Sequence, residues 1–193
     1  MTSPTPQIEK ERVERIRDQL GDRRWHELSI EELASAMQLS RMTLHRRGID
    51  KDALREALGE LLADEFRAAA LPALTAAGPA PERLRMALEV VCRVDERYLG
   101  LIEDLGEDRE RVFHDDGDGA VLTRGSFTEA LRRILEDGER EGTLDPGADP
   151  AEKATLLFNA ASWTYRHMRL GHRWDAERAR SQVVDLLVAG VSR

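Results

Sequence analysis

The stretch of residues 29–51 constrains the fold more than any other part of the chain. Ser29 is a good helix N-cap, and Glu32 follows three residues later, where a capping box requires it. Apolar side chains then recur every three to four residues, which places them on one face of a helix. The pattern predicts a short helix over residues 30–37.

A second short helix is predicted directly after the first. Ser40 can cap a helix over residues 41–47, in which Leu44 supplies the apolar anchor against the first helix, and Gly48 then ends it. Two short helices joined by a tight turn form a helix-turn-helix, whose second helix enters the major groove of DNA. Residues 41–51 contain one acidic residue against four Lys/Arg, which is the charge that a polyanion favours.

The same stretch resembles the N-terminal domain of TetR-family (tetracycline-repressor-like) transcriptional regulators. The family motif usually ends in a Ser-x-x-Thr-Leu-Tyr-x-x-Phe run, followed by a Lys that opens the fourth helix. Ser40, Thr43, Leu44 and Lys51 match this pattern. The resemblance implies a DNA-binding head on a helical body that binds a small effector and forms a homodimer.

Four positions depart from the family pattern. His45 stands where the family usually has Tyr, Gly48 where it usually has Phe, and Gln38 and Arg24 where Gly is common. Gly48 leaves a second interpretation open, in which the chain keeps the fold but has lost operator binding. It would then serve as a ligand-sensing or assembly module.

The residues expected to contact double-stranded DNA lie on the second helix of the motif and shortly after it. In a major groove, arginines pair with guanine or clamp phosphates, and Met and Thr touch the thymine methyl group. The resemblance implies that Thr43 and His45 contact the backbone or bases and that Lys51 holds a phosphate. For the three arginines, a solvated helix face is the alternative. The predicted DNA-binding residues are Arg41, Met42, Thr43, His45, Arg46, Arg47 and Lys51.

Charge is distributed unevenly along the chain. Residues 1–51 hold 10 Lys/Arg and 9 Asp/Glu, whereas residues 52–193 hold 19 and 28, which gives the whole chain a net charge of -8. An acidic body with a locally basic head fits a regulator that touches DNA only through its head. We therefore expect a helix-turn-helix DNA-binding domain at residues 1–51 and an effector-binding and dimerisation domain at residues 52–193.

Helices are predicted in the rest of the chain as well. No strand-like alternation is present, so the fold class is all-α, with a three-helix N-terminal domain followed by a larger helical domain. The first helix ends near Gly21, and the helix after Lys51 is expected to break or kink at Pro72. Later helices are predicted over residues 82–105, 122–140, 150–170 and 176–191, with a short helix and an acidic loop over residues 107–119.

The resemblance implies that the last two helices form a two-fold dimer. Their apolar stripes include Leu157, Ala161, Val184 and Leu187, which would build a four-helix interface across the axis. Burial within one subunit gives the same pattern, so the sequence leaves both interpretations open. A dimer would present two heads to the half-sites of a palindromic operator.

The resemblance also implies that an effector binds in the body and changes the separation of the two heads. Repression, rather than activation, follows from this analogy alone. Effector sites are mostly apolar with a few polar groups, and each side chain that fits this description could equally be core or surface. The candidates are Arg93, Tyr98, Phe127, Asn159, Trp163, Tyr165 and His167.

Two rival interpretations of the chain are a metal protein and an enzyme. His114, Asp115, Asp116 and Asp118 lie close together, but their spacing matches no established metal-ligand pattern, and acidic loops with glycine are usually solvated turns. No phosphate loop and no nucleophile or zinc-protease motif is present, so nothing assembles a reaction. We expect no metal, no other cofactor and no enzymatic activity.

The remaining sequence features concern the cellular compartment. Cys92 is the one cysteine, which excludes an intramolecular disulfide and a cysteine-based zinc cluster. The first ten residues lack the apolar core of a signal peptide, and no stretch approaches the roughly 18 apolar residues of a membrane span. We therefore expect a cytoplasmic protein.

Overall fold

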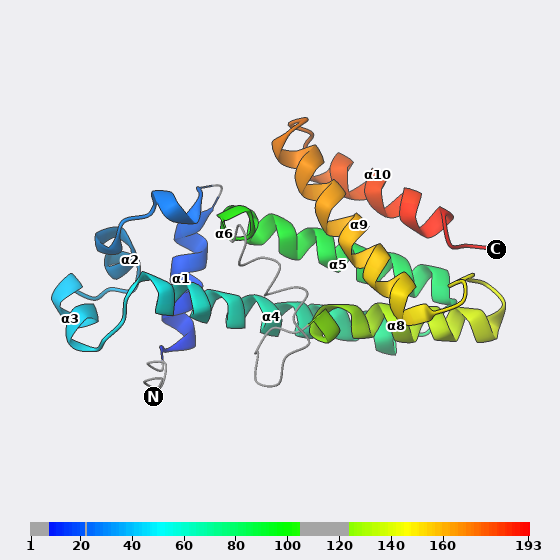
Figure 1. The fold of residues 1–193 in the computed structure, drawn as a ribbon, viewed down its shortest axis with the longest axis horizontal. Coiled ribbons are helices and arrows are strands. Elements are labelled where there is room, and N and C mark those ends of the chain that lie inside the picture. Colours follow the sequence, from blue (N-terminus) through cyan, green and yellow to red (C-terminus); the bar gives the residue numbers. More distant parts are fainter. Residues whose placement is uncertain (1–7, 22, 105–123) are drawn as a thin grey trace.

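The computed structural model describes residues 8–21, 23–104 and 124–193, and this part of the chain is helical (Figure 1). Its one β-type pairing is an isolated bridge between Leu144 and Ser192. The predicted all-α fold class is confirmed. In chain order the elements are α1 (Lys10–Leu20), the 3-10 helix η1 (Trp25–Glu27), α2 (Ile30–Ala36), α3 (Arg41–Arg46), α4 (Lys51–Thr75), α5 (Ala80–Arg97), α6 (Leu99–Asp104), α8 (Arg124–Glu141), α9 (Pro150–Leu170) and α10 (Ala176–Ala189).

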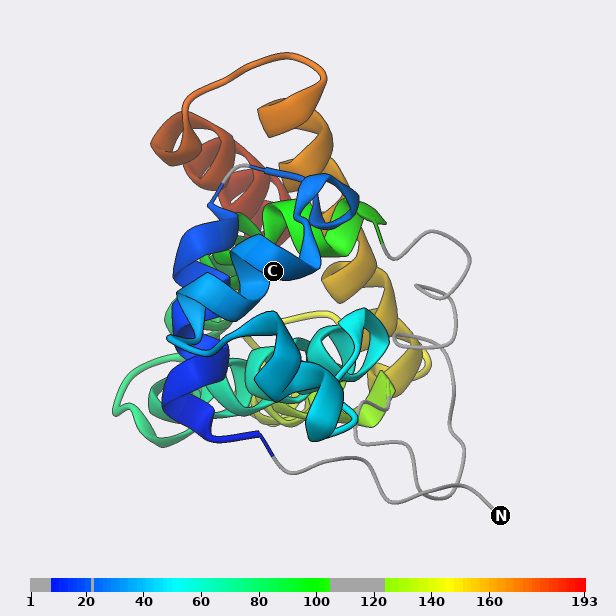
Figure 2. The ribbon, with the colours of Figure 1, turned by 90° about the vertical axis from the view of Figure 1, so that its left-hand side faces the viewer.

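The head consists of α1, η1, α2 and α3 and forms one end of the molecule (Figure 1). Helix α1 packs against α2 and against the first part of α4, and α2 packs against α3. The apolar positions that the sequence assigned to these helices, such as Ile16, Leu33 and Leu44, are buried together. Gly21, with a φ of +49°, follows α1 directly, as predicted. Figure 2 views the head end-on, with α1, α2 and α3 nearest the viewer.

The body consists of α4, α5, α6, α8, α9 and α10. Helix α5 contacts α4, α8, α9 and α10, so it lies at the centre of this bundle. Helices α9 and α10 run against each other and cover one side of α5 (Figure 1). Because α4 begins in the head and ends in the body, it joins the two parts as a single helix. No helix of the described residues is long and apolar enough to cross a membrane.

Three expectations about helix boundaries were wrong. The helix predicted over residues 82–105 is two helices, because the backbone leaves the helical conformation at Tyr98, with φ -114° and ψ 19°. Helix α4 is not broken at Pro72 but continues to Thr75, with the proline in its last turn. The last helix ends at Ala189 rather than at residue 191.

The turn at Tyr98 directs α6 toward the head. Gly100 has no room for a side chain, because a Cβ atom at this position would lie 1.9 Å from the carbonyl oxygen of Arg23. Helix α6 therefore contacts the backbone of the segment between α1 and η1 directly. The predicted short helix and acidic loop over residues 107–119, which include the metal candidates His114, Asp115, Asp116 and Asp118, lie outside the described residues.

Candidate nucleic-acid interface

The predicted capping box is present at the start of α2. The hydroxyl of Ser29 accepts from the backbone N–H of Glu32 over 3.2 Å, and the Glu32 carboxylate accepts from the Ser29 N–H over 2.8 Å. The guanidinium of Arg23 also donates to this carboxylate, over 2.9 Å. The hydrogen bonds that the Glu32 carboxylate accepts, first of all the one from the Ser29 backbone, lower the pKa of Glu32 to about 2. The start of α2 is thus fixed by a charged cap.

The turn between α2 and α3 contains a strained residue. Gln38 has a φ of +56°, in the left-handed region that favours glycine, and it stands where the family commonly has Gly. Just before it, the carbonyl oxygen of Met37 accepts from Nη1 of Arg12 on α1 over 2.6 Å. The turn is therefore held by the first helix of the head as well as by its own backbone.

Both ends of α3 are closed by local hydrogen bonds. At its start, the hydroxyl of Ser40 accepts from the backbone N–H of Thr43 over 3.1 Å. At its end, the N–H of Ile49 donates to the carbonyl of Leu44 and the N–H of Gly48 to that of His45, which is a Schellman motif. Gly48 has the required left-handed φ, +67°, and both Leu44 and Ile49 are buried. The Gly at this position, where the family has Phe, is therefore explained by the turn.

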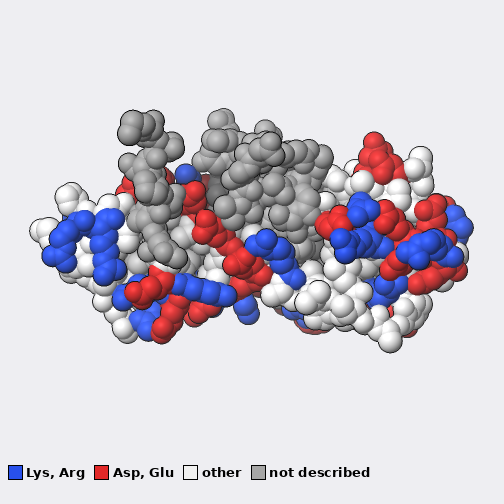
Figure 3. All heavy atoms as spheres, turned by 90° about the horizontal axis from the view of Figure 1, so that it is seen from below, with Lys and Arg blue, Asp and Glu red and all other residues white. Residues whose placement is uncertain are grey.

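The predicted DNA-binding residues of α3 lie at the free end of the head. Met42 is 73% exposed, and Arg46 and Arg47 are also exposed and form no ion pair with any described residue. Arg41 is exposed too, but it forms an ion pair with Glu31 of α2. In Figure 3, basic side chains gather at the tip of the molecule over α3. This end of the head thus presents positive charge beside an apolar side chain.

The other three predicted DNA-binding residues differ in their accessibility. Thr43 is half-buried and its hydroxyl lies 2.8 Å from that of Ser40, whereas His45 is exposed. The ammonium group of Lys51 donates to the carbonyl oxygen of Leu28 over 2.7 Å and lies 5.4 Å from the centre of the Trp25 ring. Lys51 therefore ties the start of α4 to η1, and its contact with a phosphate stays a prediction.

The effector candidates fall into buried and exposed groups. Phe127 is buried, and its ring centre lies 5.1 Å and 5.5 Å from those of Phe66 and Phe158. Tyr165 is buried and donates a hydrogen bond to Glu96 over 2.8 Å. Tyr98 is also buried, Asn159 is half-buried, and Arg93, Trp163 and His167 are exposed.

Two of these candidates lie beside groups that sequence reasoning missed. The Trp163 ring centre lies 5.3 Å from the guanidinium carbon of Arg166, which is buried beside Asp95. Phe127 belongs to the cluster with Phe66 and Phe158. Phe158, Ser162 and Arg166 repeat at every fourth residue, and this spacing is the one sequence signal for a shared face of α9.

Of the two interpretations of these apolar stripes, the structure supports burial within one subunit for most of the named residues. Leu157, Ala161 and Val184 are buried within this one chain, and Leu187 is partly buried against the same core. The apolar side chains that remain exposed on these two helices are different ones. They are Leu156, Trp163 and Leu170 on α9 and Leu186 on α10, which are 44–70% exposed.

Metal-binding and thiol chemistry find no support in the described part of the chain. Residues 8–21, 23–104 and 124–193 contain no group of three or more His, Cys, Asp or Glu side chains that could hold a metal ion. Cys92 is buried, and this burial raises the pKa of its thiol far above the ordinary value. The thiol therefore stays protonated at neutral pH, and it is the thiolate that acts as a nucleophile or metal ligand.

Solved structures match the chain over almost its whole length, although no protein-family model and no curated sequence does. The TetR-family transcriptional regulator PfmR from Thermus thermophilus is 22% identical, with a TM-score of 0.67 over 94% of this chain and 99% of its own. A TetR/AcrR-family regulator from Thermobifida fusca is 20% identical, with a TM-score of 0.65 over 94% and 97%. The chain has the TetR-family fold.

The same fold is found in E. coli NemR in its reduced form, which is 14% identical and has a TM-score of 0.71 over 95% of this chain and 96% of its own. At such identities the likeness establishes the fold. The resemblance that Ser40, Thr43, Leu44 and Lys51 indicated is thereby confirmed in structure. In the TetR-family fold, α2 and α3 are the helix-turn-helix and α9 and α10 are the last helix pair of the body.

Proposed function

We propose that the protein is a transcriptional regulator that binds DNA through α3. The observation that carries this proposal is the exposed end of the head, where Met42, Arg46 and Arg47 project from a helix that is capped at both ends. A rigid helix with cationic and apolar side chains fits the major groove, where arginines contact guanines or phosphates. Because Arg41 is paired with Glu31, the positive charge offered to DNA comes mainly from Arg46 and Arg47.

The alternative function, a sensor or assembly module without DNA binding, depended on Gly48. A glycine is favoured at this left-handed position, and Ile49 fills the space behind α3. The departure from the family pattern therefore gives no reason to expect a damaged head. The regulator remains the better supported function.

We propose that the regulator works as a homodimer through α9 and α10. Leu156, Trp163 and Leu170 follow at intervals of seven residues, so they share one side of α9, and Leu186 is exposed on the adjacent α10. A helix pair with this many exposed apolar side chains is covered most simply by the same pair of a second copy, across a two-fold axis. Two heads would then read the two halves of a palindromic operator.

The two parts of the chain would have different roles in such a regulator. We propose that residues 1–51 form the DNA-binding domain and that residues 52–193 form the dimerisation domain, which also receives a small-molecule effector. Effector binding would release the protein from its operator, so the protein would act as a repressor. We propose no enzymatic activity for it. Helix α4 spans the boundary and would carry the change between the two parts.

A selection experiment tests this function without knowledge of the operator. Purified protein is incubated with a pool of random DNA duplexes, bound duplexes are recovered and amplified over several rounds, and the products are sequenced. A regulator of this kind should enrich a two-fold-symmetric sequence whose half-sites lie about one helical turn apart. Recovery of unrelated sequences after all rounds, with no common motif, would contradict the proposal.

A further inference from the structure

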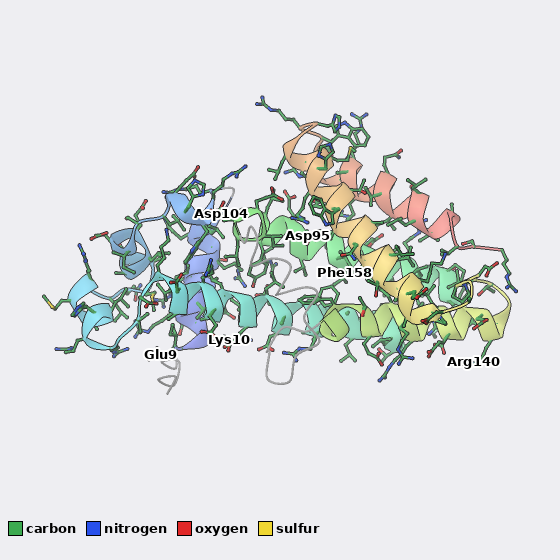
Figure 4. The ribbon with its side chains drawn as sticks, viewed as in Figure 1. Glu9, Lys10, Asp95, Asp104, Arg140 and Phe158 are labelled. Carbon is green, nitrogen blue, oxygen red and sulfur yellow. The ribbon has the colours of Figure 1, made fainter. Side chains whose placement is uncertain are left out.

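Three charged side chains from three helices meet in the body, two of them buried and the third, Glu103, partly exposed. Asp95 of α5 and Arg166 of α9 are 5% and 3% exposed, and Nε of Arg166 lies 3.7 Å from Oδ2 of Asp95. Nη1 of Arg166 donates to Oε1 of Glu103, on α6, over 2.9 Å. Figure 4 shows Asp95 in the body, away from the tip of the head. Two carboxylates thus share one guanidinium, which leaves an excess of negative charge.

Oδ2 of Asp95 is buried and has no hydrogen-bond partner. The distance of 3.7 Å to Arg166 is too long for a hydrogen bond, and Nε of Arg166 donates instead to the carbonyl oxygen of Ser162 over 3.2 Å. A buried carboxylate oxygen without a donor destabilises the fold, so its presence calls for a functional explanation. The oxygen thus lacks a hydrogen bond that the donor of a bound molecule could supply.

An aromatic cluster lies along the same side of α9. Phe158, Ser162 and Arg166 are four residues apart, so their side chains follow one another along one face of the helix. The Phe158 ring packs against Phe127 of α8 and against Phe66 of α4, with ring centres 5.5 Å and 6.2 Å away. This buried face of α9 therefore changes from aromatic to charged within two helical turns.

We propose that this face of α9 is the effector site and that the effector is a small molecule joining an apolar group to a protonated amine. The apolar group would lie against the phenylalanine cluster, and the amine would donate to Asp95 and neutralise the excess negative charge. An anionic molecule would meet two carboxylates, and a neutral one would leave the excess charge uncompensated. This inference rests on the proposed function in one respect only, which is that the ligand of this site is called an effector.

The test compares arylalkyl amines with their uncharged and anionic counterparts. Benzylamine and 3-phenylpropylamine, benzyl alcohol and 3-phenylpropanol, and 3-phenylpropanoate are each titrated into the DNA-free protein at millimolar concentrations. Binding is followed by calorimetry and by the thermal unfolding midpoint. We expect at least one amine to bind and to raise this midpoint, because a ligand of the native state stabilises it, whereas the alcohols and the acid should not.

Two variants separate a ligand site from ordinary packing. Asp95→Asn keeps the shape of the side chain, and we expect it to weaken amine binding by at least about tenfold, since a charge-assisted hydrogen bond is lost. Asp64→Asn, at an exposed carboxylate of α4, is the matched control and should bind the amine as the native protein does. If Asp95→Asn does not fold, Glu103→Gln takes its place, because it also lowers the excess negative charge.

The stability of the ligand-free variant is a second readout. We expect Asp95→Asn to unfold at the same temperature as the native protein or higher, since the uncompensated charge is gone. The proposal would be overturned if no amine binds, if alcohols bind equally well, or if Asp95→Asn lowers the midpoint and leaves binding unchanged. None of these results depends on DNA, so they are distinguishable from a failure of the regulator function.

Discussion

The carboxylate of Asp104, the last residue of α6, accepts two hydrogen bonds from His26 in the head. Its Oδ2 lies 2.6 Å from the backbone nitrogen of His26 and 2.7 Å from its ring Nδ1. Figure 4 shows Asp104 at the end of α6 that faces the head. Together with the close contact of Gly100 with Arg23, this pair fixes α6 to the segment just before the helix-turn-helix.

Removal of this carboxylate should loosen the junction between head and body. We expect Asp104→Ala to lower the free energy of unfolding by about 1–2 kcal/mol, because a charge-assisted hydrogen bond and a backbone hydrogen bond are lost. Urea unfolding followed by circular dichroism measures this change. Glu139→Ala, at an exposed position near the far end of α8, should change it little. Equal losses in the two variants would argue against a specific role for Asp104.

Glycine is favoured at both Gln38 and Gly48, so substitutions at these two positions should change stability in opposite directions. Both have left-handed backbones, with φ of +56° and +67°. Gly48→Ala should therefore destabilise the protein by about 1 kcal/mol, although a Cβ there would meet no atom within 4 Å. Gln38→Gly should stabilise it by roughly 0.5 kcal/mol, because relief of strain exceeds the added flexibility of the unfolded chain. Thermal unfolding of both variants checks the two signs, and a loss of stability in Gln38→Gly would contradict this account of the turn.

The exposed leucines of α9 and α10 predict a way to separate the homodimer. Leu156→Lys/Leu186→Lys places two charges on the proposed interface, and we expect it to sediment as a monomer where the native protein sediments as a dimer. The matched control is Leu71→Lys, at another leucine that is more than half exposed, on α4. A native protein that is monomeric at micromolar concentration, or a double variant that stays dimeric, would contradict the proposed interface.

The buried carboxylate of Asp95 predicts how stability depends on pH. Burial raises the pKa of Asp95 to about 6, although Arg166 and Ser162 oppose the shift. In the unfolded chain an Asp titrates near about 3.9. At a pH between these two pKa values, the folded state binds a proton at Asp95 and the unfolded chain does not. Above about pH 6 the carboxylate is ionised in both states, and its burial lowers the free energy of unfolding. This loss of stability disappears as the pH falls toward about 4.

Measurement of unfolding at a series of pH values tests this sign. The stability of Asp95→Asn relative to the native protein should be greatest at pH 7, by about 3 kcal/mol at most, and should shrink toward pH 4. Glu129 is the contrasting case, because hydrogen bonds from Arg132 and Arg133 lower its pKa to about 2. Glu129→Gln should cost stability at neutral pH and lose that effect only below about pH 4. A difference for Asp95→Asn that does not vary with pH would show that its carboxylate does not titrate in this range.

Features with a local cause could be predicted from the sequence. The Ser29 and Glu32 capping box, the Ser40 cap and the end of α3 at Gly48 each depend on residues within one or two helical turns. The buried faces of the helices followed in the same way from the spacing of apolar residues. Which helix buries which face could not be read from the sequence, so it left open whether Leu157 and Val184 lie at a dimer interface or in the core, where the structure places them.

Features with a distant cause could not be predicted. His26 and Asp104 are 78 residues apart, and Glu103 and Arg166 are 63 residues apart, and no local spacing marks either pair. The end of α5 at Tyr98 lies two residues before Gly100, but a single Gly within a long apolar pattern did not mark the break, and the approach of Gly100 to Arg23 is visible only in the fold. The DNA-facing side chains could be named but not ranked, since the pairing of Arg41 with Glu31 depends on the geometry of two helices.

The central claim is that α3 holds the protein on DNA, and one measurement tests it most directly. The native protein, Arg46→Ala/Arg47→Ala and the control Arg67→Ala/Arg140→Ala are titrated with the DNA flanking the gene at several salt concentrations. The control removes two exposed arginines of the body, and Figure 4 shows Arg140 at the end opposite the head. We expect tight, sequence-selective binding that weakens steeply with salt for the native protein and the control.

The α3 variant should lose most of this affinity, and its salt dependence should fall by roughly one unit of slope for each phosphate contact removed. That result would place the interface on α3. If the native protein and the α3 variant bind this DNA equally, with the same salt dependence and no preference over unrelated DNA, the claim that α3 reads an operator there is contradicted.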